Sequence, residues 1–188
     1  IDLKNITINE SNSNFKNDAN GVVETKDGKK LVVYPPGKKD TEYVIQHETI
    51  GSYSFNGNNY IENITIGFNV KTIESNPFRR CDKIKTIEIE SGNTLFEVTN
   101  GILIEKEKKR IITYILATTT EILYIPYGIE TIDTNAFEYA INLKSIYLPI
   151  TITTLGSYVF KDNTKLLNIF YLSNTVIEDK TILEGCSE

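Results

Sequence analysis

The sequence predicts a β-rich solenoid, in which short strands and turns recur as a unit of 23 residues. Four-residue phrases that begin with Phe or Leu are versions of one another, and the steps 55→78, 137→160 and 160→183 are each 23 residues. A strand phrase repeats alongside them, and charged hairpin tips repeat at a longer interval. Repetition at this spacing is typical of chains whose units bury their apolar faces only against their neighbours.

The strand phrase consists of an apolar residue, two variable residues, Ile, one variable residue and a second apolar residue. Its last three positions alternate inward and outward, as a half-buried strand requires. It occurs at 3–8, 61–66, 84–89, 143–148 and 166–171. A second phrase places Ile or Leu five residues before Phe, as in Ile50 and Phe55. The residues after each Phe predict short helical turns on the convex side of the solenoid.

Two inserted β-hairpins are predicted at 15–34 and 96–114. Each segment contains an Asn-Gly step, a charged tip and a Tyr 13 residues after the Gly. The Asp27-Gly28 step between apolar residues is a strong hairpin signal. The hairpins define a longer module of about 82 residues, the spacing of Ile50 and Ile132. We therefore expect one solenoid domain over 1–188, with modules at about 3–83 and 84–165 and a partial module at 166–188.

Composition excludes several classes of function. The chain has 188 residues, of which 40% are hydrophobic and 24% charged, as in a folded soluble domain. Its net charge of −5 gives no bias toward polyanions, so no nucleic-acid partner is expected. No apolar run reaches about 18 residues, so no membrane span is expected. The chain starts at Ile1 and contains no Met, which indicates a processed or trimmed chain.

The residues that could carry chemistry are few. Cys81 and Cys186 occupy the same slot of different repeats, so they should lie roughly 20 Å apart as buried, reduced thiols without a disulfide. His47 is the single histidine and is expected to be a solvated loop residue. Glu88 and Glu90 face one side of a strand that has no cleft-forming loop. No calcium loop, zinc set or phosphate-binding loop is present, so we expect neither catalysis nor a cofactor.

Two further features remain open. Basic residues gather at the hairpin tips and after the first hairpin, either as contacts for an anionic ligand or, the interpretation we favour, for solubility and protection of strand edges. They are Lys29, Lys30, Lys38, Lys39, Lys106, Lys108, Lys109 and Arg110. Asn5 and Asn63 begin Asn-x-Thr triplets, which matter only in a eukaryotic secretory protein and are as easily chance matches.

The outward face of the predicted sheet gives the sharpest functional clue. Tyr124, Tyr147 and Phe170 are spaced 23 and 23 residues apart, so they should form one row on an exposed face. Thr65 and Glu88 occupy the same outward position in earlier repeats, as does Thr7. Exposed aromatic residues are enriched at contact surfaces. Cross-strand stacking that only stabilises the sheet is the alternative.

The recurring phrase resembles the BspA-like class of leucine-rich repeats. The resemblance is carried by Leu143-x-x-Ile146-x-Leu148-Pro149 and its continuation to Leu166, and by the stretch from Ile129 to Phe137. It covers essentially all 188 residues, although Asn58, Ala140 and Asn163 stand where cysteine is common. The resemblance implies a leucine-rich-repeat solenoid from a surface or secreted protein of host-associated bacteria or protozoan parasites, with a role in adhesion.

We therefore predict a non-catalytic cell-surface or secreted protein that mediates adhesion or protein–protein binding. Its partner would be a protein or other cell-surface macromolecule, including one from a host, bound at Tyr124, Tyr147, Phe170, Glu88 and Thr65. A rigid repeat spacer that presents another domain, or a glycan-binding module, is the alternative.

Overall fold

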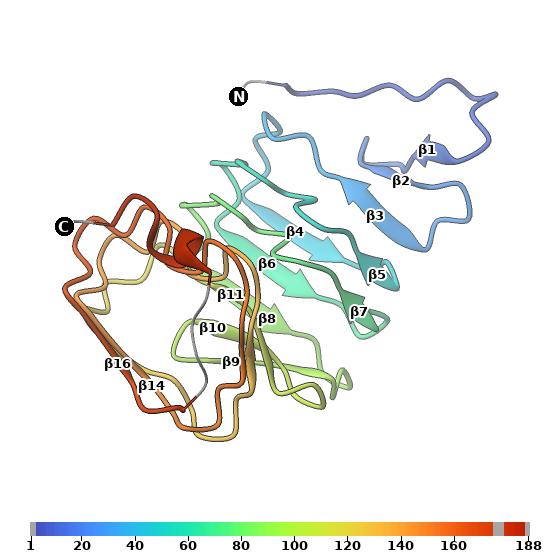
Figure 1. Ribbon diagram of the computed structural model, residues 1–188. Helices are drawn as coiled ribbons and strands as arrows, with labels where there is room; N and C mark the ends of the chain where they lie inside the picture. The colour runs from blue at the N-terminus through green and yellow to red at the C-terminus, as the bar shows by residue number, and fades with distance from the viewer. Residues whose placement is uncertain (1–2, 175–178, 187–188) are drawn as a thin grey trace. The chain divides into compact units, whose positions relative to one another are not determined.

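The computed structural model describes residues 3–174 and 179–186. The chain divides into two compact units, unit 1 at 1–94 and unit 2 at 95–188 (Figure 1). The single array over 1–188 remains a prediction. Among the described residues, every regular element is a strand except one short 3₁₀ helix, η1 (Lys180–Leu183).

Unit 1 contains two sheets. The first has the order β1-β2-β3-β5-β7, antiparallel through β3 and parallel from there on. The second is the parallel sheet β4-β6-β8. Their bounds are β1 (Phe15–Asn17), β2 (Val23–Thr25), β3 (Lys30–Val33), β4 (Glu42–Ile45), β5 (Thr49–Ile50), β6 (Asn63–Ile66), β7 (Thr72–Ile73) and β8 (Thr86–Ile89).

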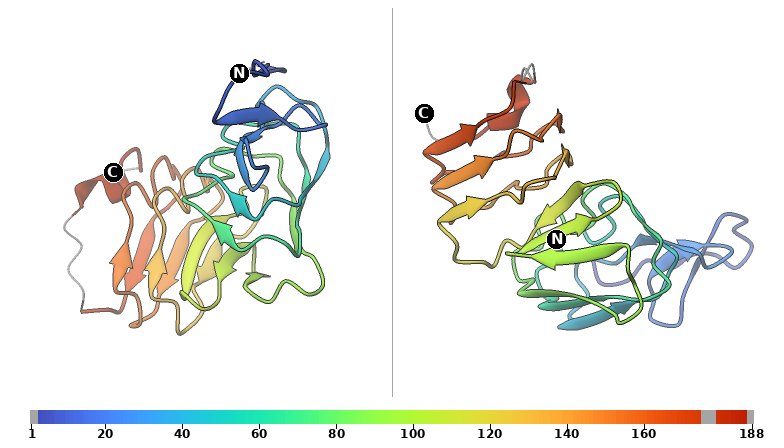
Figure 2. Two further views of the ribbon diagram at one scale, coloured as in Figure 1. Left: turned by 90° about the vertical axis from the view of Figure 1, so that its right-hand side faces the viewer. Right: turned by 90° about the horizontal axis from the view of Figure 1, so that it is seen from below.

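Unit 2 repeats the same plan. One sheet has the order β9-β10-β11-β13-β15, and the parallel sheet β12-β14-β16 is drawn as neighbouring rungs in Figure 2. The bounds are β9 (Phe96–Thr99), β10 (Ile102–Glu105), β11 (Arg110–Tyr114), β12 (Ile122–Tyr124), β13 (Thr131–Ile132), β14 (Ser145–Leu148), β15 (Thr154–Leu155) and β16 (Asn168–Tyr171).

Both predicted hairpins are present. In unit 1 the turn between β2 and β3 contains Asp27 and Gly28, and in unit 2 the turn between β10 and β11 contains the second basic tip. Each hairpin carries an additional strand on its outer side, β1 or β9, so each is a three-stranded antiparallel meander. The last strand of each meander then pairs in parallel with the short strands of the following coils.

Aromatic columns form the centre of each unit. Tyr34 stacks on Phe55 with ring centroids 4.9 Å apart, and Phe55 lies 5.2 Å from Phe78. In unit 2 the corresponding column runs from Tyr114 through Phe137 to Phe160, at 5.3 and 5.7 Å. All six side chains are buried. The recurring Phe of the sequence is therefore a core residue whose ring packs on its counterpart in the next coil.

The structure corrects the first strand phrase. Leu3 to Ile8 is not a strand, and Thr7 is exposed outside any sheet. The side chain of Asn17 occupies the place of a pairing strand, because its Oδ1 accepts from Ile8 N and its Nδ2 donates to Ile6 O, both at 2.8 Å. Backbone polar groups that a side-chain amide satisfies have no need of a sheet partner.

The predicted helical turns are also different in detail. Within the described ranges only η1 is helical, and the segments after Phe55, Phe78 and Phe137 are hydrogen-bonded turns. These turns contain residues with positive φ, such as Arg80 (55°) and Tyr139 (67°), which an α-helix does not accept. The two-residue strands β5, β7, β13 and β15 begin the same phrase. Sequence alternation does not mark them, because two residues are too few to show a period.

Candidate functional site

The outward face of β12-β14-β16 in unit 2 carries the predicted aromatic row. Tyr124 pairs with Tyr147 across β12 and β14, and Tyr147 pairs with Phe170 across β14 and β16. On the opposite face of the same strands, Leu123 and Ile146 are buried in the core. The row therefore follows from the period-2 alternation of the strand combined with the 23-residue register.

The three rings form a continuous stack. The centroids of Tyr124 and Tyr147 are 4.5 Å apart with planes 12° from parallel, and those of Tyr147 and Phe170 are 4.3 Å apart at 10°. Tyr124 is 62% exposed and Phe170 41%. Each inner ring face is covered by its neighbour, so the row offers mainly ring edges and the outer faces of its end members to a partner.

Other exposed apolar residues surround the row, and the sequence analysis missed several of them. Ile122 precedes the row on β12, and Leu172 follows it after β16. Tyr127, which is 81% exposed, and Ile150 lie just beyond the ends of β12 and β14. Each of these two residues directly follows a Pro, and they are 23 residues apart, so the repeat could have revealed them. Exposed large apolar side chains are therefore concentrated on and beside this sheet.

Thr65 and Glu88 lie in the other unit. They are paired neighbours on β6 and β8, on the outward face of β4-β6-β8. A groove of about 320 Å³ on this face is lined mainly by polar residues of the three strands. The aromatic row and this polar face belong to different sheets, so the five predicted site residues form two chemically distinct groups.

His47 is not the solvated residue that the sequence analysis expected. It is only 8% exposed, and its Nε2 lies 2.8 Å from Oε2 of Glu24 on β2. Lys16 Nζ lies 3.3 Å from the other oxygen of Glu24. The loop after β4 thus turns inward onto the hairpin, and the contact joins the hairpin to the coil. A glutamate within the apolar run of the hairpin was the available signal, because a buried carboxylate requires partners.

Several cationic side chains of the hairpin tips form ion pairs with acidic side chains. Lys30 lies 2.6 Å from Glu74, and Lys109 lies 2.6 Å from Glu130. Arg110 bridges two carboxylates, with Nη2 2.6 Å from Glu105 and Nη1 2.6 Å from Asp133. These pairings remove much of the local positive charge that an anionic ligand would need.

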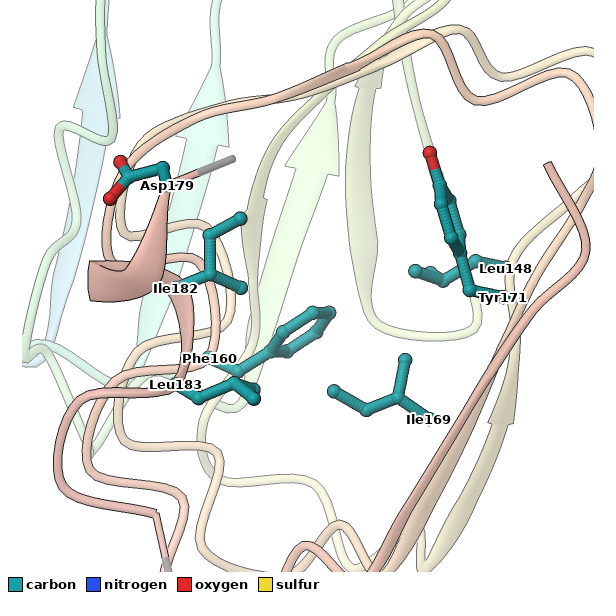
Figure 3. A pocket seen from close by; sticks show the side chains of 7 residues that line it. All are labelled: Leu148, Phe160, Ile169, Tyr171, Asp179, Ile182 and Leu183. Atoms are coloured by element: carbon teal, nitrogen blue, oxygen red, sulfur yellow. The ribbon is translucent and has the colours of Figure 1, made fainter. Parts of the chain in front are cut away.

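An apolar cavity of about 330 Å³ lies between β16 and η1 (Figure 3). Leu148, Phe160, Ile169, Tyr171, Asp179, Ile182 and Leu183 line it. Most of these side chains belong to the interior of the coil, and the Tyr171 hydroxyl is buried without a hydrogen-bond partner in the described part of the chain. The cavity offers packing surface rather than a set of convergent reactive groups.

Within the described ranges, no group of three or more His, Cys, Asp or Glu residues is placed to hold a metal ion. No described helix has the length and apolar character that crossing a bilayer requires.

The comparison with protein families decides the classification. The model described as "BspA type Leucine rich repeat region" matches this chain in six copies, over residues 40–101 and 94–188. The chain belongs to the BspA-type leucine-rich repeat family. A search of curated proteins found no match.

Solved structures agree with this BspA-type fold. A leucine-rich repeat protein from Eubacterium ventriosum matches at 23% identity and a TM-score of 0.60, over 72% of this chain and 42% of its own. The pneumococcal vaccine antigen PcpA matches at 25% identity and 0.60, over 72% and 39%. A leucine-rich cell surface protein from Faecalibacterium prausnitzii matches at 19% and 0.55, over 76% and 41%. This chain thus spans less than half the length of each.

The geometry explains the cysteine slot of the BspA-type repeat. Cys81 Sγ donates to the carbonyl of Phe55, and Cys186 Sγ donates to that of Phe160, each at 3.0 Å and across 26 residues. Both thiols are free, with Cys81 buried and Cys186 only partly so. Burial raises the pKa of the Cys81 thiol to about 12, so it remains a protonated donor. The prediction of a buried, free thiol is confirmed for Cys81, whereas Cys186 is less buried than predicted.

The same geometry accounts for the departures from the BspA-type pattern. Asn163 Nδ2 donates to the Phe137 carbonyl at 2.9 Å, again across 26 residues. Asn58 Nδ2 donates to the carbonyl of Lys38 at 3.2 Å. Ala140 has no side-chain donor and contributes a methyl group to the core instead. An amide therefore replaces the thiol as the donor that links one coil to another.

Proposed function

We propose that this protein is a non-catalytic, cell-surface or secreted binding protein that attaches to a protein on another cell, including a host cell. The contact surface is the outward face of β12-β14-β16, with the row of Tyr124, Tyr147 and Phe170 at its centre. The observation that carries the proposal is that these aromatic side chains remain on an exposed face while the opposite face of the same strands is buried.

The surroundings of the row support a contact surface. Ile122, Tyr127, Ile150 and Leu172 are each more than half exposed. Burying them against a partner would be favourable, at roughly 25 cal/mol for each Å² of apolar area removed from water. The related structures include a leucine-rich cell surface protein and a vaccine antigen, which supports a location on the cell surface.

Ring orientation favours a protein partner over a glycan. A sugar ring packs on an open aromatic face, whereas both faces of Tyr147 are covered and Tyr124 and Phe170 each have one face covered by the row. Ring edges and phenol hydroxyls instead suit aliphatic groups, aromatic faces and carbonyl oxygens, all of which a protein surface supplies.

The test measures, by flow cytometry, how much fluorescently labelled full chain binds to epithelial cells. It compares the wild type with the triple variant Tyr124→Ala/Tyr147→Ala/Phe170→Ala. We expect the triple variant to lose about 90% of the saturable binding, because removal of several contact-surface aromatics costs more than a tenfold loss of affinity. The single variant Tyr124→Ser, at the exposed end of the row, should show a smaller loss in the same direction.

The matched control is Phe68→Ala with Leu3→Ala, which removes exposed apolar side chains of unit 1 that lie outside both parallel sheets. It should bind as the wild type does. If the triple variant is folded and binds the cells as the wild type does, the row serves only to stabilise the sheet, as a rigid spacer would require.

A further inference from the structure

We propose a second contact surface on unit 1, where the outward face of β4-β6-β8 binds an extended, basic segment of a partner protein. This proposal is independent of the aromatic row, because it rests on a different sheet and on charge instead of apolar area. Six side chains point outward from the three strands: Glu42, Val44, Asn63, Thr65, Thr86 and Glu88. All six line the groove on this face.

The face is anionic and has no counter-charge of its own. Other glutamates of unit 1 form ion pairs with lysine, such as Glu62 with Lys85 at 2.7 Å and Glu48 with Lys71 at 2.9 Å. Glu42 and Glu88 form no ion pair with any described residue. None of the six outward side chains is cationic. The groove thus presents two carboxylates whose charges are left for a partner to neutralise.

Side-chain hydrogen bonds order the floor of the groove. Asn63 Oδ1 accepts from the Thr86 hydroxyl at 2.8 Å, and Asn63 Nδ2 reaches Oε1 of Glu42 at 3.5 Å. A second hollow adjoins the first at Glu42 and continues past β4 to Lys38 and Asp40, which neutralise each other at 3.0 Å. A partner segment would therefore lie across the strands in a polar groove, and the net charge of that groove comes from Glu42 and Glu88.

The spacing of the two carboxylates defines the ligand. Glu42 and Glu88 are two strands apart and two residues out of register. Strand separations of about 4.8 Å and a rise of about 3.3 Å per residue place their Cα atoms roughly 12 Å apart. Among the described residues, the two carboxylates belong to no group of three or more His, Cys, Asp or Glu side chains that could hold a metal ion. In an extended peptide, residues i and i+4 lie on the same side and about 13 Å apart, which matches this distance.

The test uses the full chain and a fluorescent nine-residue Ser/Gly peptide with two lysines four positions apart, measured by fluorescence anisotropy at low salt. We expect Glu42→Gln/Glu88→Gln to weaken binding about tenfold, the effect of two lost charge pairs. A peptide of the same composition with adjacent lysines should bind more weakly to the wild type. Binding should also weaken as NaCl is raised.

The matched control is Glu97→Gln/Glu107→Gln, which removes the same charge from exposed positions of unit 2. It should leave binding of the peptide unchanged. Equal weakening by both double variants, or equal affinity for the two peptides, would overturn the proposal, because either result indicates attraction to net charge only. Binding of a neutral oligosaccharide in the groove without binding of the peptide would also overturn it. Because glutamine is isosteric with glutamate, both variants should fold, which their thermal midpoints would verify.

Discussion

At the scale of single residues, Gly156 occupies a position that permits no side chain. Its amide donates to the Ile132 carbonyl at 2.8 Å, and a Cβ at this position would lie 2.3 Å from Thr134 N. Backbone of one coil therefore lies directly against backbone of the next. We expect Gly156→Ala to lower the free energy of unfolding by about 2 kcal/mol, since the coils must separate to admit the methyl group. Urea unfolding measures this, with exposed Thr119→Ala as the control.

The partly buried Asp133 predicts a specific pH dependence. Burial raises its pKa from 3.8 to about 6, against the opposing attraction of Arg110, and repulsion from Glu105 adds to the rise. The folded state thus binds the proton more tightly than the unfolded state does, so this group's contribution to stability decreases as pH rises from about 4 to 6. Asp133→Asn removes the titration.

The measurement is the difference in unfolding free energy between wild type and Asp133→Asn at pH 4 and pH 7. Relative to the variant, the wild type should be less stable at pH 7 than at pH 4, by about 2 kcal/mol. A difference of the opposite sign would mean that the ion pair with Arg110 lowers the pKa of Asp133 by more than burial raises it.

Individual side-chain environments were only partly predictable from sequence. The outward positions of Tyr124, Tyr147 and Phe170 follow from the repeat, because the 23-residue period and the strand alternation both determine them. The environment of His47 depends on how one loop turns toward Glu24, which no repeat specifies. The position of Arg110 between Glu105 and Asp133 likewise depends on contacts across the hairpin.

At the scale of elements, the aromatic columns stabilise the coils. Phe137 is fully buried between Tyr114 and Phe160. We expect Phe137→Ala to lower the free energy of unfolding by about 4 kcal/mol, since it removes a large side chain and leaves a cavity in the column. Guanidinium unfolding would show the loss, and Tyr127→Ala, which truncates a largely exposed ring, should change stability little. Similar losses of stability in the two variants would contradict a stabilising role for the aromatic column.

The predictability of each element depended on its length. Four-residue strands such as β6, β8, β14 and β16 show the alternation and were found. Both hairpins were found as well, the first through its Asp27-Gly28 turn and the second through its similarity to the first. The two-residue strands β5, β7, β13 and β15 carry no period. The phrase at Leu3–Ile8 has the right pattern without a strand neighbour, so the pattern alone gave the wrong structure there.

At the scale of the whole molecule, one repeat plan presents two different surfaces. The parallel sheet of unit 2 exposes aromatic and aliphatic side chains, whereas that of unit 1 exposes carboxylates, hydroxyls and an amide. Outward positions carry no packing constraint, so a repeat can vary them without loss of fold. The two proposed contacts therefore differ in the chemistry they require, an apolar surface for one sheet and a basic segment for the other.

The claim that the sheet face of unit 2 makes the contact is tested most directly by site-specific photo-crosslinking. The photoreactive residue p-benzoylphenylalanine would replace Tyr147 in one protein and Phe68 in another, and each would be irradiated on epithelial cells. We expect covalent capture of a cell-surface protein from position 147 and little from position 68. Capture from position 68, with none from position 147, would contradict it.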